Sequence, residues 1–302
     1  MRVDRNSVVV IAGASGQVGR ATARLLASRE AQIALISGRD ELEEAERDVE
    51  SLGGRAIVIP TDLNRFDQVQ AAADAAEREF GPIDLWINNA MVSMYSPFMK
   101  MSPGEFKHIV KRTFLGQVYG TYCALQRMMQ RDHGVIIQVG SSLAFRSIPL
   151  QSAYCASQHA VQGFTESIHN ELTRQKSNVR VSAVGIPPLN AAQFTSTKNK
   201  MPRRARLAGT TVPPEVAADA ILFAVENDHR ETIVGYRTVE AMSGDHVSHG
   251  RFDNLARNVG KQFWATRHRT ALSRLFIIVG VGVAMALLVS HGAKSGRSFV
   301  RA

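Results

Sequence analysis

The chain begins with an apolar run, Val8-Val9-Val10-Ile11, that continues as Ala12-Gly13-Ala14-Ser15-Gly16-Gln17-Val18-Gly19. The apolar, mostly β-branched residues predict a short buried strand. A helical pattern from Arg20 to Ser28 follows the glycines directly. A strand, a glycine-rich turn and a helix in this order form a cradle for a dinucleotide. Glycine lets the backbone approach the pyrophosphate, which then lies at the positive end of the helix.

Strands and helices alternate along most of the chain. Further strands are expected at 33–37, 56–60, 85–87, 135–139, 180–184 and 232–234, and helices at 41–52, 66–80, 103–131, 152–176 and 214–227. This alternation predicts an α/β fold with a parallel, doubly wound sheet. The long loop at 185–212 is rich in Lys and Arg. It is a candidate substrate lid, and a solvated basic loop beside a membrane is the alternative.

Composition places the chain among ordinary globular proteins. It has 302 residues, of which 45% are hydrophobic and 21% charged, as expected of a core-forming domain with an appendage. Both cysteines, Cys123 and Cys155, fall in predicted helices, so a reducing compartment is expected rather than a disulfide scaffold. The first residues lack the apolar core of a signal peptide.

The last 52 residues carry nine Lys and Arg against one Asp, within a chain of net charge +9. Such a basic tail suits nucleic acid or membrane, but an apolar run favours membrane and no nucleic-acid partner is expected. The 19 residues between Arg274 and Lys294 include no Lys, Arg, Asp or Glu. As a helix they would span about 28 Å, close to the thickness of a bilayer core. A membrane-spanning anchor is expected, with an interfacial helix or a buried oligomer helix as alternatives.

Four segments follow from these patterns. They are a dinucleotide-binding domain at 1–240, a basic linker at 241–270, the apolar helix at 271–293 and a basic tail at 294–302. His246 and His249 lie in the linker without an acidic or thiol partner that would complete a ligand set. No metal site is therefore expected.

Tyr154 is the main candidate for catalysis. Residue 158 lies one helical turn further on, so both side chains share a face. A lysine there would favour the phenolate and convert the tyrosine into a general acid and base. The chain has Gln158 instead, which can hydrogen-bond but carries no charge.

Spaced motifs in a fixed order now identify a family likeness. With its glycine turn, Arg39, Asp62, Asn88-Asn89-Ala90, Ser141 and Tyr154, the chain resembles the short-chain dehydrogenase/reductase family over about residues 7–240. The resemblance implies a Rossmann fold of about seven parallel strands. It also implies assembly as dimers or tetramers through long helices, so a homo-oligomer is expected.

The resemblance implies a set of cofactor-binding residues. They are Gly13, Ser15, Gln17, Val18, Gly19, Arg39, Asp62, Leu63, Asn88, Ala90, Gln158 and Pro187. Arg39, after the second strand, would bind the 2′-phosphate of NADP(H), whereas an acidic residue would favour NAD. Alternatively, Arg39 caps the strand end and pairs with a nearby carboxylate.

The resemblance also assigns the chemistry. Ser141, thirteen residues before Tyr154, would polarise a substrate carbonyl, and Tyr154 would transfer the proton. Thr113 stands where the family often has an asparagine that holds a proton-relay water. Gln158 replaces the family's lysine, and could bind the nicotinamide ribose without lowering the tyrosine pKa. The glycine turn also departs from the family's usual Gly-x-x-x-Gly-x-Gly spacing.

These observations lead to one expectation and one alternative. We expect an NADP(H)-dependent oxidoreductase that interconverts an alcohol and a carbonyl, anchored in a membrane by its C-terminus with the catalytic domain facing the cytoplasm. A lipophilic small-molecule substrate would suit that location. The alternative is an NADP(H)-binding pseudoenzyme, or scaffold, that lost activity with the lysine.

Overall fold

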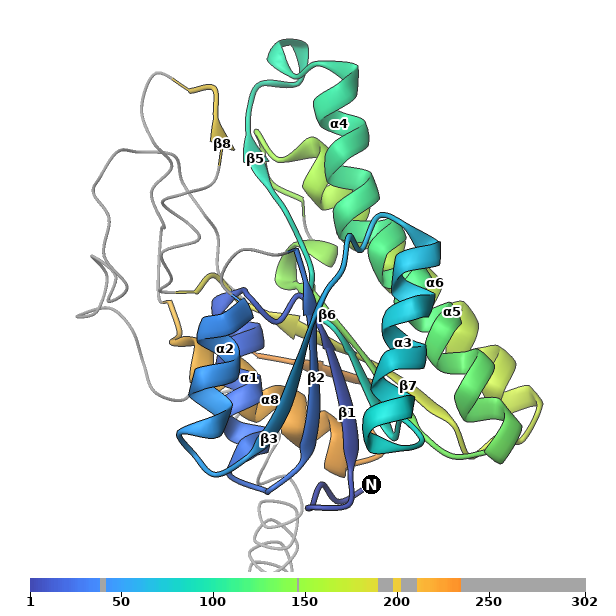
Figure 1. Cartoon of the computed structure of the whole chain (residues 1–302). Helices are drawn as coiled ribbons and strands as arrows, with labels where there is room; N and C mark the ends of the chain where they lie inside the picture. The colour runs from blue at the N-terminus through green and yellow to red at the C-terminus, as the bar shows by residue number, and fades with distance from the viewer. Residues whose placement is uncertain (39–41, 146, 190–197, 202–210, 235–302) are drawn as a thin grey trace, which may run out of the picture. The chain divides into compact units, whose positions relative to one another are not determined.

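Seven parallel strands form the main sheet of the computed structural model, which describes residues 1–38, 42–145, 147–189, 198–201 and 211–234 (Figure 1). They are β1 (Val8–Ala12), β2 (Gln32–Ser37), β3 (Arg55–Pro60), β4 (Leu85–Asn88), β6 (Val135–Ser141), β7 (Arg180–Ile186) and β9 (Glu231–Ile233). Their order is β3-β2-β1-β4-β6-β7-β9. The predicted doubly wound parallel sheet is confirmed.

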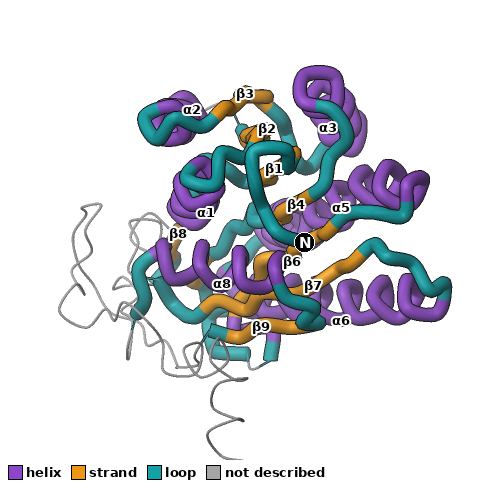
Figure 2. The backbone as a smooth tube through the Cα atoms, turned by 90° about the horizontal axis from the view of Figure 1, so that it is seen from below, coloured by secondary structure: helices purple, strands orange, loops and turns teal. Residues whose placement is uncertain are grey.

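Helices cover both faces of this sheet (Figure 2). One face carries α1 (Gln17–Ala27), α2 (Leu42–Glu50) and α8 (Pro214–Glu226), and the other carries α3 (Phe66–Phe80), α5 (Gly116–Met128) and α6 (Ser152–Arg174). Because both faces are covered, the strands are apolar throughout rather than alternating. The β1 residues and Trp86 of β4 are buried in the core.

The helix expected at 103–131 is divided into α4 (Pro103–Val110), a π-helical turn at Lys111–Leu115, and α5. At the start of α4, Ser102 accepts a hydrogen bond from the backbone of Glu105, whose side chain accepts one from the backbone of Ser102. This reciprocal cap fixes where the helix begins. Short 3₁₀ turns occupy Phe98–Lys100, Met129–Arg131 and Ser142–Ala144.

A second, small sheet joins two distant segments that were not predicted as strands. In it, β5 (Met94–Tyr95) pairs in parallel with β8 (Lys198–Asn199). The β8 strand belongs to the loop at 185–212 that the sequence marks as a candidate lid. Part of that loop, 190–197 and 202–210, lies outside the described residues.

The strand order places a ligand crevice next to β1. The chain winds from β1 toward β2 and β3 on one side, and β4 begins the other side. At such a switch point the connections diverge, and ligands bind beyond the carboxyl ends of the strands.

The expected linker, apolar helix and tail at 241–302 lie outside the described residues. Among the residues that are described, no helix combines the length and the apolar character needed to cross a bilayer.

Candidate active site

A cavity of about 210 Å³ opens at the predicted crevice. Its lining includes Gly13, Ser15, Val18 and Ala90, four of the residues expected to bind a dinucleotide. The other lining residues are Gly16, Ser37, Asn89, Met91, Val92, Arg112, Ile186 and Leu189. The cavity therefore collects residues from the ends of β1, β2 and β7 and from the segment after β4.

Steric crowding requires glycine at two points of the turn. Gly13 has φ +88°, and a Cβ there would lie 2.7 Å from the backbone nitrogen of Ala90. A Cβ on Gly19 would collide with the carbonyl oxygen of Gly13. Asn89 Nδ2 donates to that same oxygen at 2.9 Å, so the turn is fastened to the segment after β4.

The start of α1 suits an anion. Its first turn contains no acidic residue, so the partial positive charge of the helix end is unopposed. Backbone N–H groups at such an end are well placed for a phosphate. The residues present therefore fit a dinucleotide pyrophosphate, even though the glycine spacing departs from the family pattern.

Gln17 lies beside this cavity rather than in its lining. It is the first residue of α1, and its Oε1 is buried with no hydrogen-bond partner in the described part of the chain. Gly16, which the sequence did not single out, lines the cavity instead. The contact expected between Gln17 and the cofactor therefore stays a prediction.

The Asn88 side chain is engaged within the protein, and its predicted place beside the cofactor ribose stays a prediction. Its Oδ1 accepts from the Trp86 indole at 2.8 Å, and its Nδ2 donates to Thr121 and Gln138 at 3.1 and 3.0 Å. These side chains form a buried network beneath the sheet, so none of the Asn88 side chain is free for a ligand. Asn89, one residue later, lines the cavity.

The residues expected around adenine are divided between surface and core. Asp62 is exposed, and its carboxylate accepts hydrogen bonds from the backbone and side chain of Asn64, which hold its pKa below the usual value. Leu63 is buried in the main core cluster and does not line the cavity. Arg39 lies outside the described residues. Ser37 ends β2, and its hydroxyl lies 2.9 Å from that of Ser15.

Tyr154 lies in the first turn of α6 and is 8% exposed. Burial raises the pKa of its phenol to about 12, and hydrogen bonding with Ser141 and proximity to Gln158 oppose this rise. Three of the four predicted catalytic side chains are therefore brought together. The phenol is nevertheless a weak acid, because no positive charge in the described part of the chain offsets its removal from water.

Gln158 is fully buried one turn along α6. Its Oε1 accepts a hydrogen bond from the backbone nitrogen of Ser141 at 3.0 Å. Because a backbone N–H can only donate, this contact fixes which end of the amide is oxygen. The Nε2 group has no hydrogen-bond partner among the described residues. It lies near enough to the phenol to favour the phenolate, without the geometry of a bond.

Ser141 ends β6, and its position supports it over Ser142 as the carbonyl-polarising serine. Its Oγ accepts a bond from the backbone nitrogen of Leu143 at 3.2 Å, which leaves the hydroxyl proton available. Ser142 is buried, and its hydroxyl has no partner in the described part of the chain.

Thr113 is engaged in structure, which limits the relay role expected for it. Its hydroxyl donates to the carbonyl of Val92 at 2.9 Å and accepts from the Val92 nitrogen at 3.0 Å. It lies fully buried in the π-helical turn. The hydroxyl therefore holds the wall of the cavity, and a water would need another group.

Met91 is a site residue that the sequence did not reveal. Its Sδ accepts a hydrogen bond from the Tyr154 hydroxyl at 3.2 Å, and its side chain lines the cavity. A thioether is a weak acceptor. Met91 therefore covers the phenol with an apolar group that a stronger acceptor can replace. Its place directly after Asn88-Asn89-Ala90 is the sequence feature that could have identified it.

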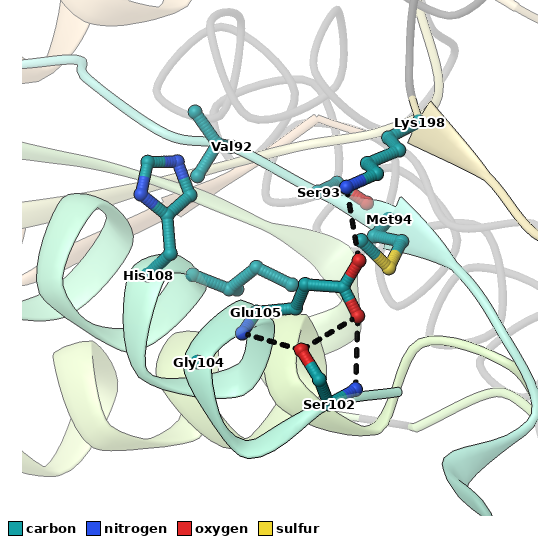
Figure 3. Close-up of a pocket in the computed structure, with 9 residues that line it drawn as sticks. Val92, Ser93, Met94, Ser102, Gly104, Glu105, His108 and Lys198 are labelled. Atoms are coloured by element: carbon teal, nitrogen blue, oxygen red, sulfur yellow. Dashed lines mark hydrogen bonds and ion pairs between the residues drawn. The ribbon is translucent and has the colours of Figure 1, made fainter. Parts of the chain in front are cut away.

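A second cavity of about 430 Å³ lies between α4 and the segment 92–94 (Figure 3). Val92 lines both cavities. Glu105, His108 and Lys198 contribute polar groups to this one. Glu105 accepts hydrogen bonds from Lys198 at 2.9 Å and Lys200 at 2.5 Å, which connects the candidate lid to α4.

Pro187 follows β7 and is buried beside Ile186, which lines the first cavity.

Within the described ranges, no group of three His, Cys, Asp or Glu side chains is placed to share a metal ion. Both cysteines are buried and free. Burial raises the pKa of Cys123 to about 11, so this thiol is unreactive.

Comparison with known proteins gives a consistent result. The family model described as short chain dehydrogenase matches residues 7–203. The chain is 31% identical over 234 residues to the uncharacterized oxidoreductase YxnA of Bacillus subtilis, covering 76% of this chain and 66% of that protein. It is 34% identical over 170 residues to dehydrogenase/reductase SDR family member 7 of Mus musculus, covering 55% and 50%. The chain thus spans no more than two thirds of these relatives.

Solved structures share the fold. A metagenomic short-chain oxidoreductase in complex with NADP is 26% identical, with a TM-score of 0.64 over 77% of this chain and 98% of that one. A xylitol dehydrogenase bound to NAD⁺ is 27% identical, with a TM-score of 0.59 over 63% and 72%. Nicotinamide dinucleotides of both kinds are therefore bound by proteins of this architecture.

Proposed function

Because the chain belongs to the short-chain dehydrogenase/reductase family, we propose that it is an NADP(H)-dependent oxidoreductase that interconverts a carbonyl and an alcohol. The convergence of Ser141, Tyr154 and Gln158 beyond the end of β6 carries the proposal. A phenol and a serine hydroxyl that meet beside a phosphate-binding turn provide the groups that carbonyl reduction needs from a protein.

The cofactor would lie along the first cavity, held by the glycine turn, the start of α1 and Ser15. When bound, it supplies or accepts the hydride. Ser37 and Gly38 leave no carboxylate at the end of β2 to oppose a 2′-phosphate. This absence, together with Arg39, favours NADP(H) over NAD(H).

In the reductive direction, Ser141 donates a hydrogen bond to the carbonyl oxygen of the substrate and polarises it. Tyr154 donates its proton to that oxygen as the hydride reaches the carbon. The phenol is protonated at neutral pH, as a general acid must be, although the raised pKa makes it a weak one. Solvent then restores the proton to Tyr154.

The Met91 thioether must move away from the Tyr154 hydroxyl during this cycle. The Tyr154 hydroxyl donates to the Met91 thioether, and a carbonyl oxygen is a stronger acceptor. A substrate that reaches the phenol therefore displaces the sulfur and leaves the methionine as an apolar cover that excludes water. Gln158 Nε2, which lacks a partner in the described chain, would donate to a ribose hydroxyl.

Turnover by the purified full-length chain tests the proposal. We expect NADPH oxidation with at least one member of a panel of aldehydes and ketones, and we expect Tyr154→Phe to abolish it. NADPH binding should survive in that variant, because the phenol hydroxyl is not part of the phosphate-binding turn. Turnover that Tyr154→Phe leaves unchanged would reject the assigned chemistry.

A cofactor-binding protein without turnover is the second candidate. It is favoured by the neutral Gln158 and by the high pKa of a phenol covered by Met91. The two candidates share NADPH binding and differ in turnover. If wild type binds NADPH but reduces no carbonyl, and Gln158→Lys gains activity, the second candidate holds.

We also propose that residues 271–293 anchor the protein in a membrane, with the catalytic domain in the cytoplasm. The uncharged run between Arg274 and Lys294 supports this, and a lipophilic substrate would be reached there. Deleting 271–302 should release the protein from a membrane pellet, and retention would refute the anchor. We further propose that the chain self-associates through its long helices, as the family resemblance implies. Analytical ultracentrifugation of the truncated protein measures this association.

A further inference from the structure

Arg112 faces the cofactor cavity from the π-helical turn between α4 and α5. It is half-buried, and the resemblance gave it no role. The lining it joins includes Gly13 and Ser15 of the glycine turn and Asn89 and Ala90 after β4. Its guanidinium is therefore placed among groups that would surround a dinucleotide.

The charge of Arg112 lacks a partner in the described structure. The other half-buried arginines there all form ion pairs: they are Arg20, Arg24, Arg127, Arg131 and Arg180. The Arg112 side chain forms neither an ion pair nor a hydrogen bond with any described residue. A partly buried arginine ordinarily has its donors satisfied, since its fork suits carboxylates and phosphates.

The Arg112 charge helps to lower the pKa of Asp62, but the two side chains form no ion pair. The Oδ1 atom of Asp62 accepts bonds from Asn64, at 3.0 Å from the backbone and 2.6 Å from the side chain. Arg112 is left with its positive charge directed to the cavity.

We propose that Arg112 binds a phosphate group of the dinucleotide, a contact that rests on the proposed function. The positive start of α1 and the Arg112 guanidinium lie on one cavity, so the site has a net attraction for a polyanion. The pyrophosphate and the 2′-phosphate of NADP share this chemistry. Arg112 thereby supplies a cation from the π-helical turn, in addition to the one predicted at Arg39.

Titration calorimetry of the full-length protein with NADP⁺ and NAD⁺ tests this inference. Arg112→Gln, which keeps much of the side-chain length, should weaken binding by about 10- to 100-fold, the range for a charged hydrogen bond. Arg112→Lys should recover part of the loss. Lys111→Gln is the matched control, because it removes the same charge from the neighbouring, exposed position and should leave binding within about twofold.

The two dinucleotides separate the two phosphates. Equal losses for NADP⁺ and NAD⁺ indicate a pyrophosphate contact, and a loss confined to NADP⁺ indicates the 2′-phosphate. Unchanged binding of both to a folded Arg112→Gln, or an equal loss in Lys111→Gln, overturns the inference and leaves the proposed function standing. A wild type that binds neither dinucleotide overturns both. Thermal unfolding without nucleotide verifies that each variant is folded; if Arg112→Gln is not, Arg112→Met, which also removes the charge, decides by the same criteria.

Discussion

Gln158 and Ser141 are joined by a hydrogen bond of 3.0 Å in which the side-chain Oε1 accepts the backbone N–H at the end of β6. The glutamine therefore holds in place the residue that carries the carbonyl-polarising hydroxyl. A lysine ammonium has only donors and could not accept this bond. The substitution at 158 has changed the support of the site as well as its charge.

Restoring the lysine should consequently have two opposed effects. In Gln158→Lys, a positive charge near Tyr154 should lower the phenol pKa by about 1–3 units. The Ser141 N–H would meanwhile lose its acceptor, and the free energy of unfolding should fall by about 1–3 kcal/mol. Urea unfolding measures the second effect, and the pH profile of carbonyl reduction measures the first.

Two further variants separate charge from hydrogen bonding. Gln158→Glu keeps an acceptor for Ser141 but raises the Tyr154 pKa further, so it should lower activity more than stability. Gln158→Met removes the acceptor and adds no charge, so it should lose stability while the Tyr154 pKa rises slightly rather than falls. A Gln158→Lys protein as stable as wild type would contradict the supporting role of the glutamine.

Reduction by wild type should be insensitive to pH over the accessible alkaline range. Burial raises the Tyr154 pKa from 10.0 to about 12, so the folded protein retains the acidic proton well above neutrality. Stability linked to this proton is complete below the ordinary pKa and is lost as pH rises from 10 toward 12. The rate of carbonyl reduction at saturating NADPH should stay level from about pH 7 to 10. A fall with a midpoint below pH 9 would show that the phenol is less shielded than the structure implies.

Met91 should limit access to the phenol. In Met91→Ala, the thioether acceptor and the apolar cover of Tyr154 are both removed, so KM should fall and turnover should rise by about two- to tenfold. The sulfur contact is worth up to about 1.4 kcal/mol, which corresponds to tenfold and sets the upper end of this range. Steady-state kinetics with a small and a bulky ketone provide the measurement.

Met91→Leu distinguishes the two contributions, because it retains bulk and removes the acceptor. Activity raised in Met91→Ala alone would assign the effect to steric cover, whereas a rise in both would assign it to the hydrogen bond. A decrease in both would mean that Met91 positions Tyr154 rather than covering it.

The sequence was sufficient for the sheet because buried parallel strands are continuous apolar runs, such as Val8–Ala12. Helix periodicity places Tyr154 and Gln158 on one face, whereas Ser141 was identified through the family resemblance. The direction in which a side chain points was harder to predict from the sequence. Asn88 and Asn89 are adjacent and chemically identical, yet one joins the Trp86 network and the other lines the cavity. Arg112 became visible only through the cavity it lines, and Met91 through its contact with Tyr154, although its place after Asn88-Asn89-Ala90 was a signal.

The contact between the candidate lid and α4 yields a final prediction. Glu105 accepts hydrogen bonds from Lys198 and Lys200, while its capping contact with Ser102 fixes the start of α4. Glutamine also serves at this position of a capping box. Glu105→Gln should therefore preserve the helix start but weaken the ion pairs that support the pairing of β8 with β5. Amide exchange in 198–201 should become faster, whereas exchange in 103–110 should change little.

The pH dependence gives an independent check. Lys200, followed by the Ser102 backbone and Lys198, holds the Glu105 pKa far below its usual 4.5. The stabilisation is complete above the ordinary pKa and is lost only as pH falls through the lower, folded value. Wild type should thus keep its exchange protection in 198–201 at pH 4, after correction for intrinsic exchange rates. Glu43→Gln, at an exposed position on α2, is the control. Loss of wild-type protection already at pH 5, or identical exchange in Glu105→Gln and Glu43→Gln, would contradict an ionic connection between α4 and the candidate lid.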